Sequence, residues 1–201
     1  GVGDWMADLA EGLAVARAVG ERVAVIATST GATLAAVALQ DPQMSERVDA
    51  AVFISPNFGI NDPAAVLLTL PGARYWVPLA AGRQRAFAPH NDGQARYWTT
   101  AYPTVALMPM AALVRRAARL DYSAVRVPAL FWLSDDDQVV RPDISRKIAA
   151  RWGGEARVQT VRPGPRDDPH AHVIAGDILS PDQTEVAALA MVDWLHAQGL
   201  R

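Results

Sequence analysis

The sequence predicts an α/β domain in which a mostly parallel sheet is flanked by helices. Short runs rich in β-branched and aromatic residues alternate along the chain with longer segments of helical pattern. That alternation is typical of parallel strands joined by crossover helices, because such strands are buried on both faces. The 201 residues, 51% of them hydrophobic, are enough for a sizeable core, and we assign residues 1–201 to a single domain.

Four short segments are the predicted strands. Continuous apolar runs at residues 22–27 (RVAVIA), 50–55 (AAVFIS) and 129–134 (ALFWLS) indicate strands that are buried in the sheet. Residues 157–162 (RVQTVR) alternate between polar and apolar side chains, which favours a strand nearer the edge of the sheet.

The predicted helices lie between and around these strands. Asp4 is the expected N-cap of the first helix, and Gly20 follows its last turn. Residues 29–40 are small and apolar, so we expect a helix that packs close to the sheet and ends before Pro42. Residues 142–152 form a further helix that starts with a proline and is followed by a glycine.

The last helix has the clearest signals in the sequence. Residues 180–183 (SPDQ) form a capping box with a proline in the first helical position. Apolar side chains follow at helical spacing, and we expect this stripe to face the sheet: Val186, Leu189, Val192 and Leu195.

Residues 57–121 differ in composition from the rest of the chain. They hold several prolines and much of the aromatic content, and they show little strand pattern. An apolar helix is expected at residues 108–120. We interpret the whole segment as an inserted helical cap, with an ordinary helical excursion over the sheet as the alternative.

Charge and composition exclude several classes of function. The 19 lysines and arginines against 21 aspartates and glutamates leave a net charge of −2. This balance gives no excess of positive charge for binding nucleic acid or an anionic membrane. No apolar run is long enough to span a bilayer, so we expect no stable membrane insertion. The chain has no cysteine and opens without a secretory signal, which favours a reducing, cytoplasmic location.

Motifs for cofactors and metals are also missing from the sequence. It contains no P-loop and no Gly-x-Gly-x-x-Gly. His170 and His172 alone supply too few ligands for a metal site. The acidic run at residues 135–137 lacks the spacing of a calcium loop. His90 and His196 are expected to be surface or packing residues. We therefore expect no cofactor and no bound metal.

The most informative local motif is residues 27–31 (ATSTG), at the junction of a predicted strand and helix. A strand, a sharp turn and a helix in this order are the context of a nucleophile elbow, whose turn needs small neighbours. The motif predicts Ser29 as the nucleophile and the Thr30 N–H as a donor to a developing oxyanion. The alternative is a serine that merely caps the helix.

A nucleophilic serine needs a base and a group that orients the base. Three aspartates at residues 135–137 directly follow one predicted strand, and His170 and His172 follow the next. Open α/β sheets build their sites at the carboxyl ends of their strands. We prefer His172 as the base because it precedes an apolar run that would anchor its loop, and we keep His170 as the second choice. A solvated acidic turn is the alternative for the aspartates.

Two segments around these residues resemble those of α/β hydrolases. Residues 134–140 (SDDDQVV) are similar to the acid loop, in which Gly-x-x-Asp precedes an apolar pair and a proline. Residues 172–177 (HVIAGD) are similar to the histidine loop of carboxylesterase-like members. The chain departs from the pattern at Ala27 and Ser134, where glycine is more usual, and at Pro142, where the proline is displaced by one.

The resemblance implies the C-terminal part of an α/β-hydrolase fold and a serine hydrolase that uses no cofactor. It also implies that Asp137 is the acid that holds the tautomer of His172. Asp135 and Asp136 remain alternatives for that role.

The same resemblance implies that strands are missing at the N-terminal side. The family sheet usually has eight strands with the elbow after the fifth, whereas this sequence shows four with the elbow after the first. We expect an N-terminally shortened form of a longer enzyme, without the loop that normally supplies a second oxyanion amide. The strand at residues 22–27 is then an open apolar edge, which we expect a second copy of the chain to cover.

The function that these expectations support is hydrolysis of a small carboxylic ester through an acyl-enzyme. Acyltransfer or thioester hydrolysis by the same triad is one alternative, and a non-catalytic binding module or an inactive shortened fragment is another. Apolar side chains of residues 57–121 are the expected substrate pocket: Leu67, Leu68, Trp76, Trp98 and Met108.

Overall fold

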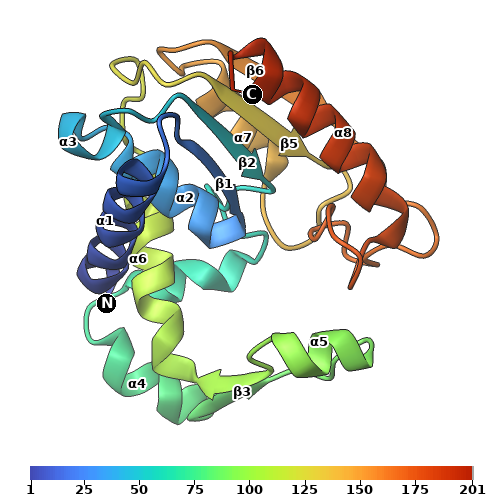
Figure 1. Cartoon of the computed structure of the whole chain (residues 1–201). Coiled ribbons are helices and arrows are strands. Elements are labelled where there is room, and N and C mark those ends of the chain that lie inside the picture. The colour runs from blue at the N-terminus through green and yellow to red at the C-terminus, as the bar shows by residue number, and fades with distance from the viewer. Residues whose placement is uncertain (201) are drawn as a thin grey trace.

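The computed structural model describes residues 1–200 and has a four-stranded parallel sheet at its centre (Figure 1). The strand order is β1-β2-β5-β6, and each of the four predicted strands is present. Their bounds are β1 Ala24–Thr28, β2 Ala50–Ile54, β5 Ala129–Leu133 and β6 Ala156–Thr160. The predicted α/β class with a mostly parallel sheet is therefore confirmed.

The burial of the strands follows their place in the sheet. All five residues of β2 and of β5 are buried, as expected for continuous apolar runs in the middle of the sheet. β6 lies at one edge, as its alternating pattern predicts, and β1 lies at the other. On β1, Ile26 is 57% exposed, so the predicted open apolar edge is present.

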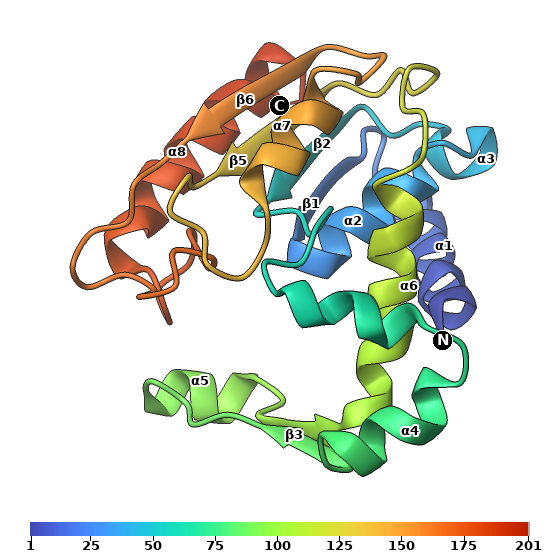
Figure 2. The same cartoon turned by 180° about the vertical axis from the view of Figure 1, so that it is seen from behind.

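Helices cover both faces of this sheet (Figures 1 and 2). One face packs against α1 (Val2–Val19), α2 (Ser29–Ala38), α6 (Leu107–Ala117) and α7 (Pro142–Ala149), which share one hydrophobic cluster with Phe53 and Phe131. The other face packs against α8 (Pro181–Ala197). A short helix, α3 (Pro42–Ser45), follows α2. Within residues 1–200, no helix combines the length and the apolar character needed to cross a membrane.

Two predictions about helix α8 are wrong. Its inward face carries Ala187, Met191 and Trp194, which pack in one cluster with Trp132. Of the predicted stripe, Val186, Leu189 and Val192 are exposed, and Leu195 alone packs against this cluster, partly buried. The longer Met and Trp side chains fill the space over the sheet better than the valines would.

The N-terminal end of α8 is also held differently from the predicted capping box. The Ser180 hydroxyl makes no cap; it donates to the Val173 carbonyl and accepts from the Asp168 N–H. The carboxylate of Asp167 accepts from the Asp182 N–H at 2.9 Å instead, so a residue distant in sequence satisfies this helix end.

The prediction for the start of α1 is also wrong. Asp4, the expected N-cap, lies inside α1, which starts at Val2.

Residues 57–121 join β2 to β5 and form a chain of short elements. Figure 2 shows α4, β3 and α5 standing away from the sheet, while α6 returns to pack beside α1 and α2. The bounds are η1 Pro63–Thr69, α4 Ala73–Ala80, β3 Gln84–Ala86, α5 Asp92–Tyr97, β4 Ala101–Pro103 and η2 Thr104–Ala106. β3 and β4 pair antiparallel, a small sheet that the sequence did not indicate. We call residues 57–121 the inserted segment.

Gly153 stands after α7 because two backbones meet there. A Cβ atom at this position would lie 1.9 Å from the Ser123 carbonyl oxygen, and the Gly153 N–H donates to the Tyr122 carbonyl at 3.0 Å. The residue 123 backbone cannot move aside without disturbing the buried Tyr122, whose ring stacks on Trp152.

We therefore expect Gly153→Ala to lower the free energy of unfolding by about 2–3 kcal/mol, as overpacking does elsewhere. Gly12→Ala is the matched control, because Gly12 lies in α1 and a Cβ atom added there would have no neighbour within 4 Å. We expect this control to be neutral or slightly stabilising. Urea denaturation followed by circular dichroism measures both. Equal stability of the two variants would contradict the close backbone approach.

Candidate active site

Ser29 lies at the sharp turn between β1 and α2. β1 ends at Thr28, α2 begins at Ser29, and the φ angle of Ser29 is 52°, in the left-handed region that non-glycine residues rarely adopt. This strained turn lifts the serine side chain beyond the carboxyl end of the strand, which is the geometry of a nucleophile elbow.

Three of the predicted site residues form a continuous hydrogen-bonded chain. The Ser29 Oγ lies 3.0 Å from His172 Nε2, and His172 Nδ1 lies 2.8 Å from Asp137 Oδ2. The side chain of His172 is 12% exposed and that of Asp137 only 2%. Residues that are 143 and 35 positions apart in sequence are thus brought into contact by the segments that follow three parallel strands.

Asp137 is distinguished from its two acidic neighbours by its contacts. Its Oδ1 accepts from the N–H groups of Val139 and Val140, at 2.8 and 2.9 Å, which leaves Oδ2 for the imidazole. Asp135 and Asp136 point outward and are more than half exposed, in ion pairs with arginines. Of the three alternatives left open by the sequence, only Asp137 is within reach of His172.

The loop that carries His172 is organised around a second buried carboxylate. Asp168 is 6% exposed and accepts from the N–H groups of His170, His172 and Val173 at 2.8–3.1 Å. Burial works to raise the pKa of Asp168, but these three N–H donors outweigh it and hold the pKa below its usual value. Ala171, with φ of 52°, is the strained residue that this tight turn requires.

Asp168→Asn is expected to lower the free energy of unfolding by about 2 kcal/mol at neutral pH, since hydrogen bonds to a charged group are worth about 1.5–3 kcal/mol. The folded carboxyl has the lower pKa, so its contribution is present above the unfolded pKa of about 3.9 and is lost as the pH falls through the folded value. The stability difference between parent and variant should therefore shrink in acid. Urea denaturation over a pH series measures it, and a difference that stays constant would refute this role.

The acid loop and the histidine loop are also joined directly. The Gln138 N–H donates to the His170 carbonyl at 2.9 Å, and the Gln138 side chain donates to the Pro169 carbonyl at 3.2 Å. These bonds hold the loop that carries Asp137 against the loop that carries His172, and so help to fix the geometry between the two side chains.

Asn57, which the sequence did not single out, supports the elbow from the neighbouring strand. Its N–H donates to the Ser29 carbonyl at 3.2 Å, its carbonyl accepts from Thr33 Oγ1 at 2.7 Å, and its side chain donates to Thr30 Oγ1 at 3.4 Å. A polar residue just beyond the end of β2 was the available signal. Thr30 is the second residue of α2, so its N–H is one of those that the helix leaves without an internal partner.

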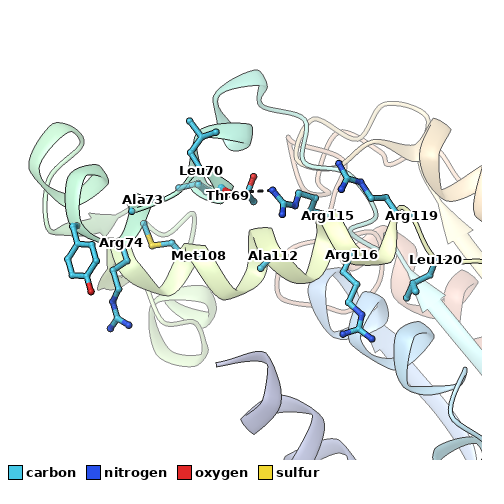
Figure 3. Close-up of a pocket in the computed structure, with 13 residues that line it drawn as sticks. Thr69, Leu70, Ala73, Arg74, Met108, Ala112, Arg115, Arg116, Arg119 and Leu120 are labelled. Atoms are coloured by element: carbon cyan, nitrogen blue, oxygen red, sulfur yellow. Dashed lines mark hydrogen bonds between the residues drawn. The ribbon is translucent and has the colours of Figure 1, made fainter.

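The residues predicted to form an apolar pocket are only partly brought together. Leu68 and Met108 line a groove of about 650 Å³ between η1, α4 and α6 (Figure 3). Leu67 and Trp98 are exposed instead, and the Trp76 indole donates to the Pro71 carbonyl. The groove is lined by neither Ser29 nor His172, and it also contains four arginines: Arg74, Arg115, Arg116 and Arg119.

A second hollow lies closer to the elbow. It measures about 470 Å³ and lies between α1 and the start of α2, where Thr30 and Gly31 form part of its wall. Its remaining lining is mainly apolar: Trp5, Leu9 and Leu34, with Asp8. This hollow therefore adjoins the predicted oxyanion donor rather than the inserted segment.

A family model described as "Serine aminopeptidase, S33" matches residues 1–166. The chain belongs to this family of α/β hydrolases. The matched residues include Ser29 and Asp137, and His172 lies just beyond them. No curated protein matches the sequence significantly.

Solved structures of lipolytic enzymes have the same fold. A structure described under the metagenome-derived lipolytic enzymes LipS and LipT matches with a TM-score of 0.76 and 18% identity, over 98% of this chain and 74% of that one. A monoacylglycerol lipase from Paleococcus ferrophilus matches with a TM-score of 0.69 and 16% identity, over 98% and 76%. A soluble variant of monoglyceride lipase from Saccharomyces cerevisiae has a TM-score of 0.69 and 11% identity, over 98% and 68%. At these identities the likeness shows the fold.

Proposed function

We propose that the chain hydrolyses carboxylic esters through an acyl-enzyme on Ser29. The observation that carries this proposal is the unbroken chain of hydrogen bonds from Ser29 Oγ through His172 to Asp137. A serine hydroxyl is a weak nucleophile until a base accepts its proton, and the imidazole Nε2 at 3.0 Å is within reach to do so.

Each residue then has one role in the reaction. Ser29 Oγ attacks the ester carbonyl carbon while His172 Nε2 takes the hydroxyl proton, and Asp137 stabilises the resulting imidazolium through Nδ1–H. The Thr30 N–H donates to the oxyanion of the tetrahedral intermediate at the positive end of α2. The alcohol leaves with the proton from His172, and water, activated by the same imidazole, releases the acid.

Two observations favour an ester over an amide as the substrate: the descriptions of similar structures and the hollow beside Thr30. Three similar structures are described as lipolytic enzymes or monoglyceride lipases, and this supports an ester with an acyl chain as the substrate class. The mainly apolar hollow beside Thr30 fits the acyl part of such a substrate. The family description names an aminopeptidase, so hydrolysis of aminoacyl amides is the outcome to test against it.

Rates on matched chromogenic substrates decide between these reactions. We expect the purified chain to hydrolyse p-nitrophenyl esters of short and medium acyl chains and to be much slower on aminoacyl p-nitroanilides. Product analysis with added alcohols separates hydrolysis from acyl transfer, since a transferase forms the new ester. Faster turnover of the anilides, or ester hydrolysis that is no faster than that of Ser29→Ala, would overturn the proposal.

A further inference from the structure

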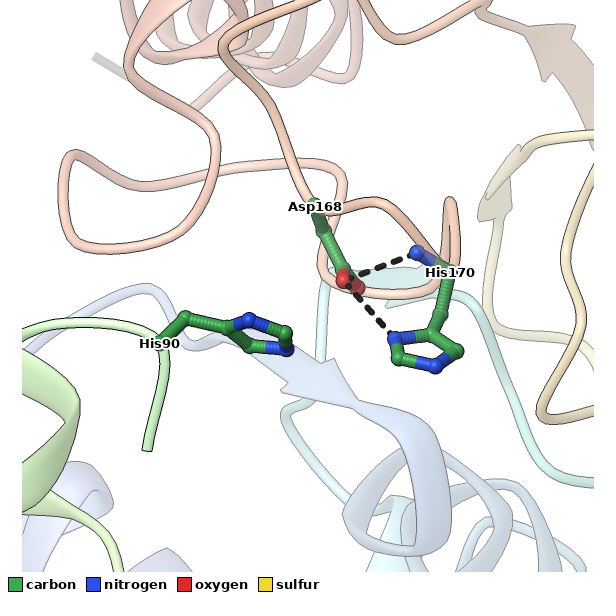
Figure 4. Close-up of side chains that lie close together, drawn as sticks. All are labelled: His90, Asp168 and His170. Atoms are coloured by element: carbon green, nitrogen blue, oxygen red, sulfur yellow. Dashed lines mark hydrogen bonds and ion pairs between the residues drawn. The ribbon is translucent and has the colours of Figure 1, made fainter. Parts of the chain in front are cut away.

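His90, Asp168 and His170 come together from distant parts of the chain. His90 lies in the inserted segment between β3 and α5, whereas Asp168 and His170 lie in the loop between β6 and α8. Figure 4 shows the Asp168 carboxylate between the two imidazole rings. One ligand atom from each residue lies within 4.8 Å of the other two, and the ring centroids are 5.9 Å apart.

We propose that these three side chains bind a divalent cation of the zinc type, which fastens the inserted segment to the loop that carries His172. Two imidazoles and one carboxylate are ligands that late first-row metals prefer, with a solvent molecule in a fourth position. The sequence alone excluded a metal because it showed only His170 and His172 as a pair. The fold supplies His90 and Asp168 and directs His172 away, toward Ser29.

The carboxylate is held ready for a metal by its own partners. Asp168 Oδ2 accepts from the His172 and Val173 N–H groups, and Oδ1 accepts from the His170 N–H at 3.1 Å. These bonds orient the carboxylate and leave lone pairs of Oδ1 directed toward the rings, as outer partners of metal ligands commonly do. Asp168 is only 6% exposed, but the two imidazoles that it faces are both exposed. A metal ion can therefore reach the carboxylate from solvent on the side of the imidazoles.

His90 is held at this place by hydrogen bonds of its own N–H group and of the neighbouring residue. Its N–H donates to the side chain of the buried Gln94 at 2.8 Å, and the neighbouring Asn91 donates to the Ile178 carbonyl at 2.6 Å. The inserted segment is therefore already in contact with the histidine loop beside the cluster. Ligands around a tetrahedral zinc lie roughly 3.3 Å apart for metal–ligand bonds of about 2.0–2.1 Å, so only small ring movements are needed.

Such an ion would act on the position of the inserted segment. It would cross-link His90 to a carboxylate that also accepts from the His172 N–H, and so couple the inserted segment to the histidine loop. The ion would take no part in the chemistry at Ser29, because the imidazole bound to that serine is not one of its ligands. This site stands independently of the proposed ester hydrolysis.

Calorimetric titration of the EDTA-treated chain with Zn²⁺ tests the proposal, with Co²⁺ absorption as a readout of ligand geometry. We expect one ion per chain, a rise in the melting temperature with Zn²⁺, and tetrahedral Co²⁺ bands. His90→Ala and His170→Ala should each weaken Zn²⁺ binding by at least about tenfold, because loss of even an outer partner costs about 10–100-fold. Both side chains are exposed, so these variants are expected to fold, as circular dichroism would show.

Two histidine variants serve as controls. His196→Ala removes an exposed histidine at the far end of α8 and should leave binding unchanged, as should His172→Ala. Without metal, His90→Ala should hydrolyse esters at the rate of the metal-free parent. No Zn²⁺ binding by the parent, binding that survives in His90→Ala, or binding lost in His172→Ala or His196→Ala would overturn the proposal.

Discussion

Replacing Ser29 with alanine should lower the rate of ester hydrolysis by about 10⁴–10⁶-fold, as loss of the nucleophile does in other serine hydrolases. The substitution removes the hydroxyl oxygen that lies 3.0 Å from His172 Nε2, so the base no longer has that hydroxyl to activate. Alanine has the same left-handed backbone cost as serine at φ of 52°, so the fold should be retained.

Steady-state turnover of a p-nitrophenyl ester measures this effect. Ser123→Ala, at an exposed serine in the loop before β5, is the matched control and should keep the full rate. If Ser29→Ala retained more than a small fraction of the parent activity, the nucleophile would lie elsewhere.

Asp137→Asn should reduce turnover by about 10⁴-fold while hardly changing the shape of the site. The amide NH₂ cannot accept the proton of His172 Nδ1–H, because the Val139 and Val140 N–H groups require the oxygen of the side chain to remain on their side. The imidazole is then driven to the tautomer that carries its proton on Nε2 and cannot receive one from Ser29.

The two neighbouring aspartates provide controls with the same chemistry. Asp135→Asn and Asp136→Asn change exposed carboxylates that pair with Arg146 and Arg162, and each should keep most of the activity. Parent-like turnover in Asp137→Asn, or a large loss in either control, would show that the acid is a different residue.

The strands were predictable because their signal is local. Runs such as AAVFIS and ALFWLS are buried on both faces, and that requirement is written into consecutive residues. The strand–turn–helix around Ser29 is local too, and the positions of Asp137 and His172 after later strands follow from the parallel sheet, whose strands all end at one side.

What could not be predicted depends on contacts between distant residues. The Asp167 cap of α8 and the support of the elbow by Asn57 join residues that are 15 and 27 positions apart and that no sequence spacing relates. The anchoring of the histidine loop by Asp168 is local, but it depends on an irregular backbone, with Ala171 at φ of 52°, that no periodic pattern indicates. The inward face of α8 was misplaced because three valines and leucines in register look like a core stripe, whereas Met191 and Trp194 fill the space better. His90 is exposed, as expected, but its closeness to Asp168 and His170 could not be predicted for the same reason, because these residues lie about 80 positions away in the sequence.

Covalent labelling with a fluorophosphonate, followed by mass spectrometry of the peptides, shows whether Ser29 is an activated nucleophile, because the probe reacts with activated serines. We expect one phosphonyl group per chain, on Ser29, with a labelling rate that falls by at least about 100-fold in His172→Ala. Labelling of another serine, an unlabelled Ser29, or an unchanged rate in His172→Ala would contradict it.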